Sequence, residues 1–183
     1  MRIIGVDPGT VCCGYGIIEA GDKSQELRVK SQKSGSKLIL HNSKLYYVAS
    51  GDIRMNRKDP LPDRLKFLHD SLDAIIHEYE PSQLCLEKIF YHKSIRSAFA
   101  LGSTRGVVLL LAAEHGLPVF EYNPTELKMA LTGYGRAEKR QVQDMVKRIL
   151  DLSVSNPSMS EDSTDALALC ICHIHSSTFK REK

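Results

Sequence analysis

Apolar residues follow two different periods along this chain, and the change of period separates predicted strands from predicted helices. Residues 2–7 (RIIGVD) and 14–20 (GYGIIEA) are short apolar runs rich in β-branched residues, which predicts two strands joined by a turn at DPGTVCC. Residues 37–42 (KLILHN) and 44–51 (KLYYVASG) supply further strand material, whereas the polar stretch 22–36 predicts a loop or a frayed hairpin. The chain is therefore expected to begin with an antiparallel meander.

From Pro60 onward the apolar spacing becomes helical. Leucine, isoleucine and tyrosine recur at helical intervals up to residue 79, which predicts an amphipathic helix of about five turns that ends before Pro81. The same reasoning predicts strands at 83–90 and 117–122, and helices at 94–116, from 124, at 137–152 and at 160–175. This order of elements predicts an α/β fold with a sheet of mixed strand direction and helices on its faces.

Composition narrows the class of protein. The 183 residues suit a single domain, and 42% hydrophobic with 26% charged residues is typical of a folded globular chain. The net charge of +3 permits a polyanionic partner without requiring one. The five cysteines form no CxxC pair, which favours reduced, buried thiols in a cytoplasmic protein. We find no secretory signal, and the apolar run 106–113 is too short to span a bilayer, so no membrane association is expected.

Four carboxylates occupy unusual positions. Asp7 ends the first strand, Glu87 interrupts the most apolar strand, and Asp162 and Asp165 stand at the start of the last, strongly apolar helix. Two of them have an ordinary explanation: a turn residue for Asp7, and favourable placement at a helix N-terminus for Asp162. Glu87 is harder to explain, because a carboxylate inside a central strand costs several kcal/mol unless it is paired or bound to a metal ion.

Convergence of the four acids would require cations. Adjacent strands can bring Asp7 and Glu87 together, and the i, i+3 spacing places Asp162 and Asp165 on one helix face. Four converging carboxylates repel one another unless divalent cations neutralise them, and oxygen-only ligands suit Mg²⁺ or Mn²⁺. Two such ions could activate water on one side of a phosphodiester and stabilise the leaving oxygen on the other.

Taken together, the motifs resemble a known family. The segments GVDPGTVCCGYGII, LEKIF, STRGV, LPVFEY, GRAEKRQVQDMVKRIL and DSTDALALCICHIH resemble, in order and content, the RuvC family of Holliday junction resolvases. The resemblance covers residues 1–20 and 60–175 and is weakest over 21–58. It implies a ribonuclease H-like fold with a mixed five-stranded sheet and helices on both faces. The expected organisation is a single nuclease domain over 1–176, with a variable hairpin or loop region at 21–58 and a tail at 177–183.

The resemblance also implies an activity and its residues. RuvC proteins act as homodimers that cut two strands of a four-way DNA junction symmetrically with Mg²⁺ or Mn²⁺, leaving 5′-phosphate and 3′-hydroxyl ends. By motif, the acidic tetrad of catalytic metal ligands is Asp7, Glu87, Asp162 and Asp165, with two ions per site. Lys128 and Lys139 match family lysines implicated in junction binding and catalysis, and Phe90 matches an aromatic residue that stacks on a base. The RuvA–RuvB branch-migration proteins are the implied partners.

Other basic side chains add positive charge near these motifs, although a solvated helix face is the ordinary explanation for any one of them. They are Lys93, Arg96, Arg105, Arg136 and Arg140. The CICHIH segment is not expected to bind zinc, because residues at i and i+2 point to different faces of a helix. His173 or His175 could still lie near the acidic site.

Two alternatives to a resolvase remain open at this point. GVDPGT is similar to the phosphate loop of actin-like sugar kinases and ATPases, although those proteins need two such domains and a second phosphate loop. A non-catalytic junction-binding or regulatory protein on the same fold is the other alternative, against which the complete acidic tetrad argues.

Overall fold

A computed structural model describes residues 1–21, 44–88, 95–152 and 159–180, and shows a five-stranded sheet at the centre of the molecule. The strands lie in the order β3-β2-β1-β4-β5. β1 pairs antiparallel with β2 and β2 with β3, whereas β1–β4 and β4–β5 are parallel pairs. The bounds are β1 Arg2–Asp7, β2 Cys12–Ala20, β3 Leu45–Arg54, β4 Gln83–Glu87 and β5 Val119–Tyr122. The sheet is therefore mixed, as predicted, with an antiparallel meander followed by parallel crossovers.

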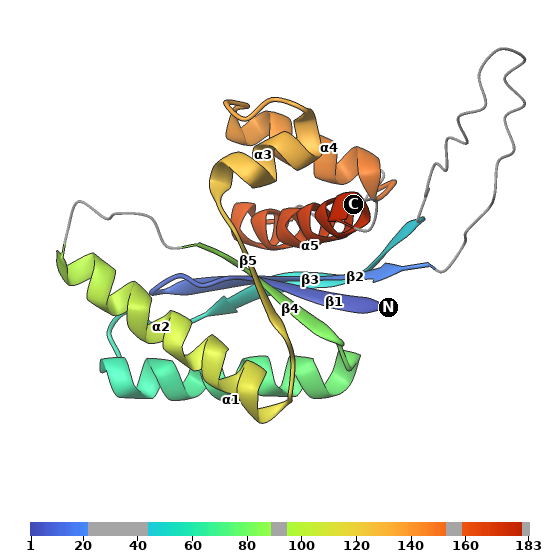
Figure 1. Ribbon diagram of the computed structural model, residues 1–183. Coiled ribbons are helices and arrows are strands. Elements are labelled where there is room, and N and C mark those ends of the chain that lie inside the picture. The colour runs from blue at the N-terminus through green and yellow to red at the C-terminus, as the bar shows by residue number, and fades with distance from the viewer. Residues whose placement is uncertain (22–43, 89–94, 153–158, 181–183) are drawn as a thin grey trace, which may run out of the picture.

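Helices cover both faces of the sheet (Figure 1). α1 (Leu61–Tyr79) and α2 (Ile95–Glu114) lie against one face, and α5 (Glu161–Lys180) lies against the other. α3 (Pro124–Thr132) and α4 (Lys139–Ile149) pack on the outer side of α5. The sandwich therefore gains a further layer on the α5 side, which leaves α5 enclosed and explains its apolar sequence.

Strand alternation assigns each side chain of the sheet to one of two cores. Ile3 and Cys85 belong to the core under α5, whereas Ile4, Val6 and Leu84 belong to the core under α1 and α2. This is the period-2 pattern of a sheet that is buried on both faces. The same alternation turns the last residues of β1 and β4 toward α5.

Glycines allow α5 to lie unusually close to the sheet. A Cβ atom added at Gly5 would overlap the backbone carbonyl of Ala166, and one at Gly14 would overlap the backbone of Asp162. At Gly16 the added atom would lie 2.8 Å from the backbone nitrogen of Leu167. These contacts fix the height of α5 above β1 and β2, because backbone rests on backbone with no side chain between.

Most predicted elements are confirmed within a few residues, and two boundaries differ. β4 ends at Glu87, so residues 89 and 90 of the predicted strand, like the predicted strand 37–42, lie outside the described residues. α5 continues to Lys180, beyond the predicted end of this helix at residue 175. Among the described residues, one segment, Ser97–Glu114 of α2, reaches the length and hydropathy of a membrane span; this is weak evidence, since core helices of soluble proteins meet the same criterion.

The glycine contacts predict a specific cost. Gly5→Ala forces the β1 backbone and α5 apart, so we expect it to lower the free energy of unfolding by about 1–3 kcal/mol or more. Gly51→Ala in β3 is the matched control, because its added methyl meets only the far end of the Tyr15 side chain. Urea unfolding of both variants measures the difference. Equal stability of the two variants would show that the Gly5 contact does not limit the approach of α5.

Candidate active site

Two neighbouring parallel strands place Asp7 and Glu87 side by side. In the β1–β4 register Val6 pairs with Leu86, so the next residues, Asp7 and Glu87, end the two strands next to each other. Both follow residues that face the α1–α2 core, and therefore both point to the α5 side. The sheet thus delivers two carboxylates rigidly to one place, beneath the beginning of α5.

The first turn of α5 brings the other two acids. The Ser163 backbone N–H donates to the Ser160 hydroxyl at 3.0 Å, which is the bond that an N-capping serine makes. Asp162 and Asp165 follow in the first turns, and the Asp162 backbone rests against Gly14, the residue paired with Asp7. The capped start of α5 therefore lies directly above the C-terminal end of β1, where Asp7 stands.

A small cleft opens over this group. Its volume is about 210 Å³, and three acids and two lysines line it together with apolar residues of α3, α4 and α5. Lys139, the first residue of α4, forms ion pairs with Asp165 at 3.0 Å and with Glu161 at 2.9 Å. The charged lining comprises Asp7, Glu87, Asp165, Lys128 and Lys139. The cleft therefore joins a carboxylate floor to a cationic rim.

Burial and mutual repulsion disfavour the ionised acids. Burial, followed by the negative charges of Asp165, Glu87 and Asp162, raises the pKa of Asp7 from 3.8 to about 7. Burial and the Asp165 charge likewise raise the pKa of Glu87. Burial raises the pKa of Asp165 as well, although the hydrogen bond from Lys139 opposes that shift. Without added positive charge, burial and mutual repulsion destabilise the ionised form of these carboxyl groups.

The structure adds two residues that the sequence did not single out. The Sγ of Cys12 and carboxylate oxygens of Asp52 and Asp162 all lie within 4.8 Å of one another. Asp52 accepts a hydrogen bond from Ser160 and pairs with Arg54 at 3.1 Å. Asp162 therefore has neighbours on the β2–β3 side as well as Asp7. No sequence signal distinguished Asp52, because it lies in a strand with ordinary alternation.

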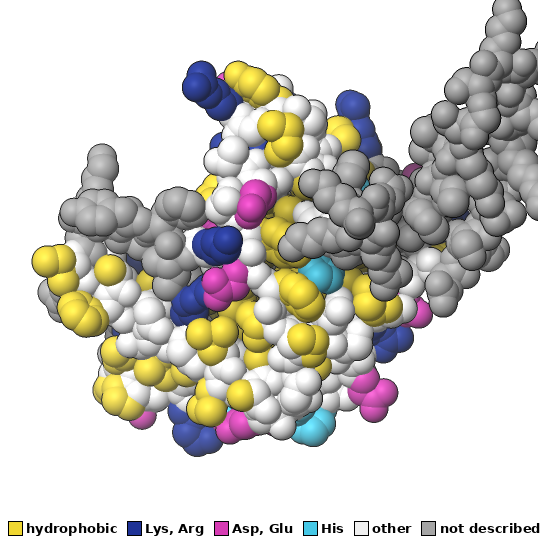
Figure 2. Space-filling view, viewed as in Figure 1, with side chains coloured by type: hydrophobic (Ala, Val, Ile, Leu, Met, Phe, Trp, Pro, Cys, Tyr) yellow, Lys and Arg dark blue, Asp and Glu magenta, His cyan; other side chains and the backbone are white. Residues whose placement is uncertain are grey.

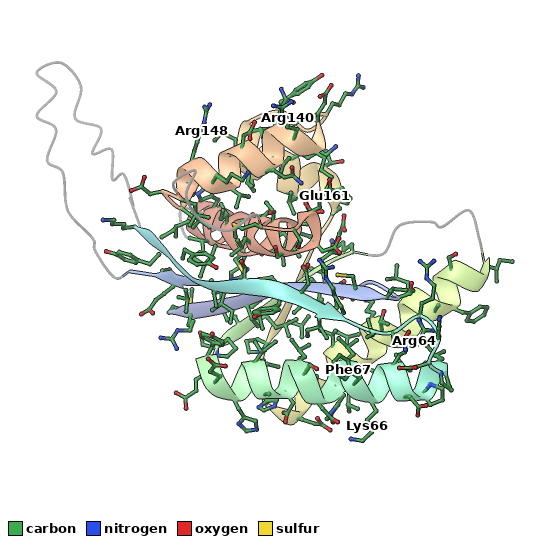
Figure 3. The ribbon with its side chains drawn as sticks, turned by 180° about the vertical axis from the view of Figure 1, so that it is seen from behind. Arg64, Lys66, Phe67, Arg140, Arg148 and Glu161 are labelled. Carbon is green, nitrogen blue, oxygen red and sulfur yellow. The ribbon has the colours of Figure 1, made fainter. Side chains whose placement is uncertain are left out.

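The predicted DNA-binding residues have mixed locations. Lys128 and Lys139 line the cleft, and Arg140 lies on the exposed side of α4, directed away from α5 (Figure 3). Arg96 belongs to the first turn of α2, but its side chain is outside the description. Phe90 and Lys93 lie outside the described residues.

Arg105 requires a correction. Only 8% of it is exposed, and its guanidinium donates to the backbone carbonyl of Glu87 at 2.8 Å and to the carboxylate of Glu121. The position of Arg105 argues against the predicted contact with DNA, because its guanidinium is buried and bonded within the protein. Arg105 instead ties α2 to the ends of β4 and β5.

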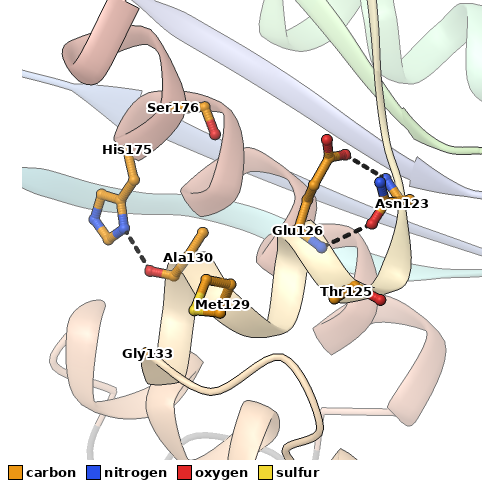
Figure 4. Close-up of a pocket in the computed structure, with 8 residues that line it drawn as sticks. All are labelled: Asn123, Thr125, Glu126, Met129, Ala130, Gly133, His175 and Ser176. Atoms are coloured by element: carbon orange, nitrogen blue, oxygen red, sulfur yellow. Dashed lines mark hydrogen bonds between the residues drawn. The ribbon is translucent and has the colours of Figure 1, made fainter.

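The histidines of α5 are also structural. His173 bonds to the Tyr122 hydroxyl at 2.6 Å and to Gln83 at 2.8 Å, and Cys170 contacts the Ile3 and Gly16 carbonyls. His175 bonds to the Ala130 carbonyl in a wider pocket of about 820 Å³ beside α3 (Figure 4). Neither histidine lines the acidic cleft, and within the described residues the cysteines are free thiols, as expected.

The arrangement suits binding of hard cations and hydrolysis of a phosphodiester. Its floor offers only carboxylate oxygens, the donors preferred by Mg²⁺ and Mn²⁺, and their raised pKa values show that positive charge would be favourable there. Lysines at the rim can contact the phosphate oxygens of a polyanionic substrate.

Comparison with known proteins agrees with this geometry. The RuvC family model, described as "Crossover junction endodeoxyribonuclease RuvC", matches residues 30–173. A protein of that name from Cupriavidus metallidurans is 42% identical over 173 residues, which cover 94% of this chain and 83% of that protein. Another from Desulfitobacterium hafniense is 40% identical and covers 96% of this chain and 93% of that protein.

Solved structures are similar over nearly the whole chain. Thermus thermophilus RuvC has a TM-score of 0.80 at 26% identity, covering 98% of this chain and 97% of that one. A structure of T. thermophilus RuvC in complex with Holliday junction substrate has a TM-score of 0.79 at 23% identity, covering 98% and 96%, and supports the fold. The predicted ribonuclease H-like fold is confirmed. The family model matches most of the chain, relatives are about 40% identical over nearly its whole length, and the acid pair beneath α5 agrees with both findings. The chain therefore belongs to the RuvC family of crossover junction endodeoxyribonucleases.

Proposed function

We propose that this protein resolves four-way (Holliday) DNA junctions by paired, symmetric strand cuts. The observation that carries the proposal is the meeting of Asp7 and Glu87, in register at the ends of β1 and β4, with the start of α5. Family membership makes a junction the substrate, and it removes the kinase-like alternative. A complete acidic group argues against a protein that only binds junctions.

Asp7, Glu87, Asp162 and Asp165 are proposed as the ligands of two Mg²⁺ ions, for which Mn²⁺ could substitute. When bound, such ions supply a nucleophilic water and stabilise the leaving oxygen, which yields 5′-phosphate and 3′-hydroxyl ends. The protein carries the four carboxylates on a strand pair and a capped helix; Asp7, Glu87 and Asp165 line the cleft, and the Asp162 backbone rests against Gly14, the residue paired with Asp7. Lys139, already paired with Asp165, is proposed to contact the substrate phosphate, and Lys128 lines the same cleft.

The first test separates cutting from binding. Asp7→Asn and Glu87→Gln remove one charge each from the floor of the cleft, so we expect cleavage of a synthetic four-way junction to fall by several orders of magnitude while junction binding persists. Asp144→Asn, at an exposed acid of α4, is the control and should cleave normally. Gel assays of binding and cleavage, with linear duplex alongside, give the measurement. Normal cutting by both cleft variants would refute the assignment.

A second test uses the acid pKa values. The pKa of Asp7 is about 7 in the folded protein and 3.8 ordinarily, so between pH 4 and 7 the metal-free folded state binds more protons than the unfolded state. The contribution of Asp7 to stability is therefore lost as pH rises through this window, by on the order of a few kcal/mol. Asp7→Asn should thus raise the Tm of metal-free protein by several degrees at pH 8 and by much less at pH 4.

Mg²⁺ should affect the two proteins differently at pH 8. It should raise the Tm of the unaltered protein and have little effect on Asp7→Asn, because the variant lacks a ligand. Differential scanning fluorimetry with and without EDTA makes both comparisons. The same Mg²⁺ response in both proteins would place the ions elsewhere.

Symmetric cutting requires two active sites. We propose that a homodimer supplies them and that α2 forms its interface. One side of α2 carries a row of exposed residues: Ile95, Phe99, Gly102, Gly106, Leu109, Leu110 and Ala113. Added Cβ atoms at Gly102 and Gly106 would meet nothing, so a second helix could approach closely there. Figure 2 shows hydrophobic side chains gathered along this helix. Large exposed apolar patches of this kind mark interaction sites.

Leu110→Glu tests this interface. A charge at Leu110, near the C-terminal end of the row, would be buried and unpaired in the interface, so it should convert the dimer to a monomer in light scattering and should abolish paired cuts. Met129→Glu in α3 is the matched control, since Leu110 and Met129 are each 53% exposed. Dimers that persist in Leu110→Glu, or that dissociate equally in both variants, would exclude the α2 row. Partnership with RuvA–RuvB stays a prediction from the resemblance, and a cytoplasmic location stays a prediction from the cysteines.

A further inference from the structure

A second group of metal-ligating side chains lies on the face of the sheet opposite to the acidic cleft. Asp73 and His77 belong to α1, and His115 directly follows α2. The Nε2 atom of His115 lies 2.6 Å from Oδ1 of Asp73, and the Nε2 atom of His77 lies 3.7 Å from the same oxygen. One ligand atom from each of the three residues lies within 4.8 Å of the others.

The two helices build this group from simple local geometry. Asp73 and His77 are four residues apart, so they lie on one face of α1, one above the other. His115 is held at the end of α2, where its backbone N–H still bonds to the Leu111 carbonyl and Gly116 then adopts φ +63°. The negative end of the α2 dipole is therefore next to the group and favours a cation there.

The donor set differs from that of the acidic cleft. Two imidazole nitrogens and one carboxylate oxygen suit a transition metal such as Zn²⁺ rather than Mg²⁺. A tetrahedral Zn²⁺ ion with bonds of about 2.0–2.2 Å sets neighbouring ligand atoms roughly 3.4 Å apart. The observed spacing needs side-chain shifts on the order of an ångström to reach it, and His77 is 72% exposed and so free to turn.

The present contacts leave the two rings in competition. His77 and His115 approach the same oxygen of Asp73, with ring centroids 4.8 Å apart in an edge arrangement. A cation held by both Nε2 atoms and by the carboxylate would satisfy all three groups at once. We propose that Asp73, His77 and His115 form a zinc-class metal site, with water in the fourth position, that clamps α1 to the end of α2.

The site would act on stability and not on chemistry. α1 and α2 form the layer below the sheet, and α2 carries Arg105, which bonds to the Glu87 carbonyl. A metal clamp between the two helices would restrain that layer, while the cleft acids lie on the other face. Mg²⁺-dependent junction cleavage is therefore expected to continue without it.

The experiment uses the full chain without an affinity tag. Excess Mg²⁺ and the Asp7→Asn background keep Zn²⁺ or Co²⁺ binding at the acidic cleft from contributing to the signal. Zn²⁺ should raise the Tm by several degrees, and Co²⁺ should develop the visible absorption of a tetrahedral nitrogen–oxygen site. His77→Gln should weaken both responses at least tenfold; because its side chain is exposed, the variant should fold normally. His115→Gln is the second variant and should have the same effect.

His69→Gln is the matched control. His69 lies two turns before His77 on α1 and has its own acidic neighbours, Asp70 and Glu114, each at 3.3 Å. It should leave Zn²⁺ and Co²⁺ binding unchanged. Equal losses in His69→Gln and His77→Gln would indicate general binding to surface histidines and overturn the proposal. Absence of any Zn²⁺ response in the unaltered histidine cluster would overturn it as well, without bearing on junction cleavage.

Discussion

The close contact between α5 and the sheet is the constraint on which the rest of the structure depends. Gly5, Gly14 and Gly16 remove the side chains that would separate the two layers, and the α5 backbone rests on the strands. Because Asp162 and Asp165 lie in the first turns of that helix, its height sets their distance from Asp7. The candidate active site is thus a consequence of packing, and the outer helices α3 and α4 keep α5 in place by covering its other side.

That packing concentrates charge where charge is unfavourable. The half-buried carboxyl groups of Asp7, Glu87 and Asp165 have raised pKa values, and Lys139 is the nearby cation that partly compensates. Such an arrangement sacrifices stability in the metal-free state in return for a site that favours incoming positive charge. A core built for stability alone would not place three acids together at a sheet end.

Much of this could be predicted from the sequence, because the anomalies were local. Charged residues stand out where the surrounding sequence is apolar. One carboxylate lies inside the run LCLEKIF, and two more stand at the start of an apolar helix. What could not be predicted depended on distant contacts. Arg105 looks like any basic residue of a helix until the strand end that it binds is known, and Asp52 becomes notable only when β3 places it beside Asp162. The Asp73, His77 and His115 group likewise joins residues about 40 positions apart.

Arg105 shows how a basic residue can support a candidate active site through the protein backbone. Its side chain extends from α2 and donates a hydrogen bond to the backbone carbonyl of Glu87, which fixes the end of β4 that carries this carboxylate.

The glycines under α5 carry a genetic consequence. At these positions the fold requires the absence of a side chain, so every missense change there adds atoms where an added Cβ already overlaps its neighbours. The tolerance of the protein to mutation should therefore be low at these glycines, although they do not line the acidic cleft. The cutting activity should therefore depend on the small size of Gly5, Gly14 and Gly16 as much as on the acidic residues.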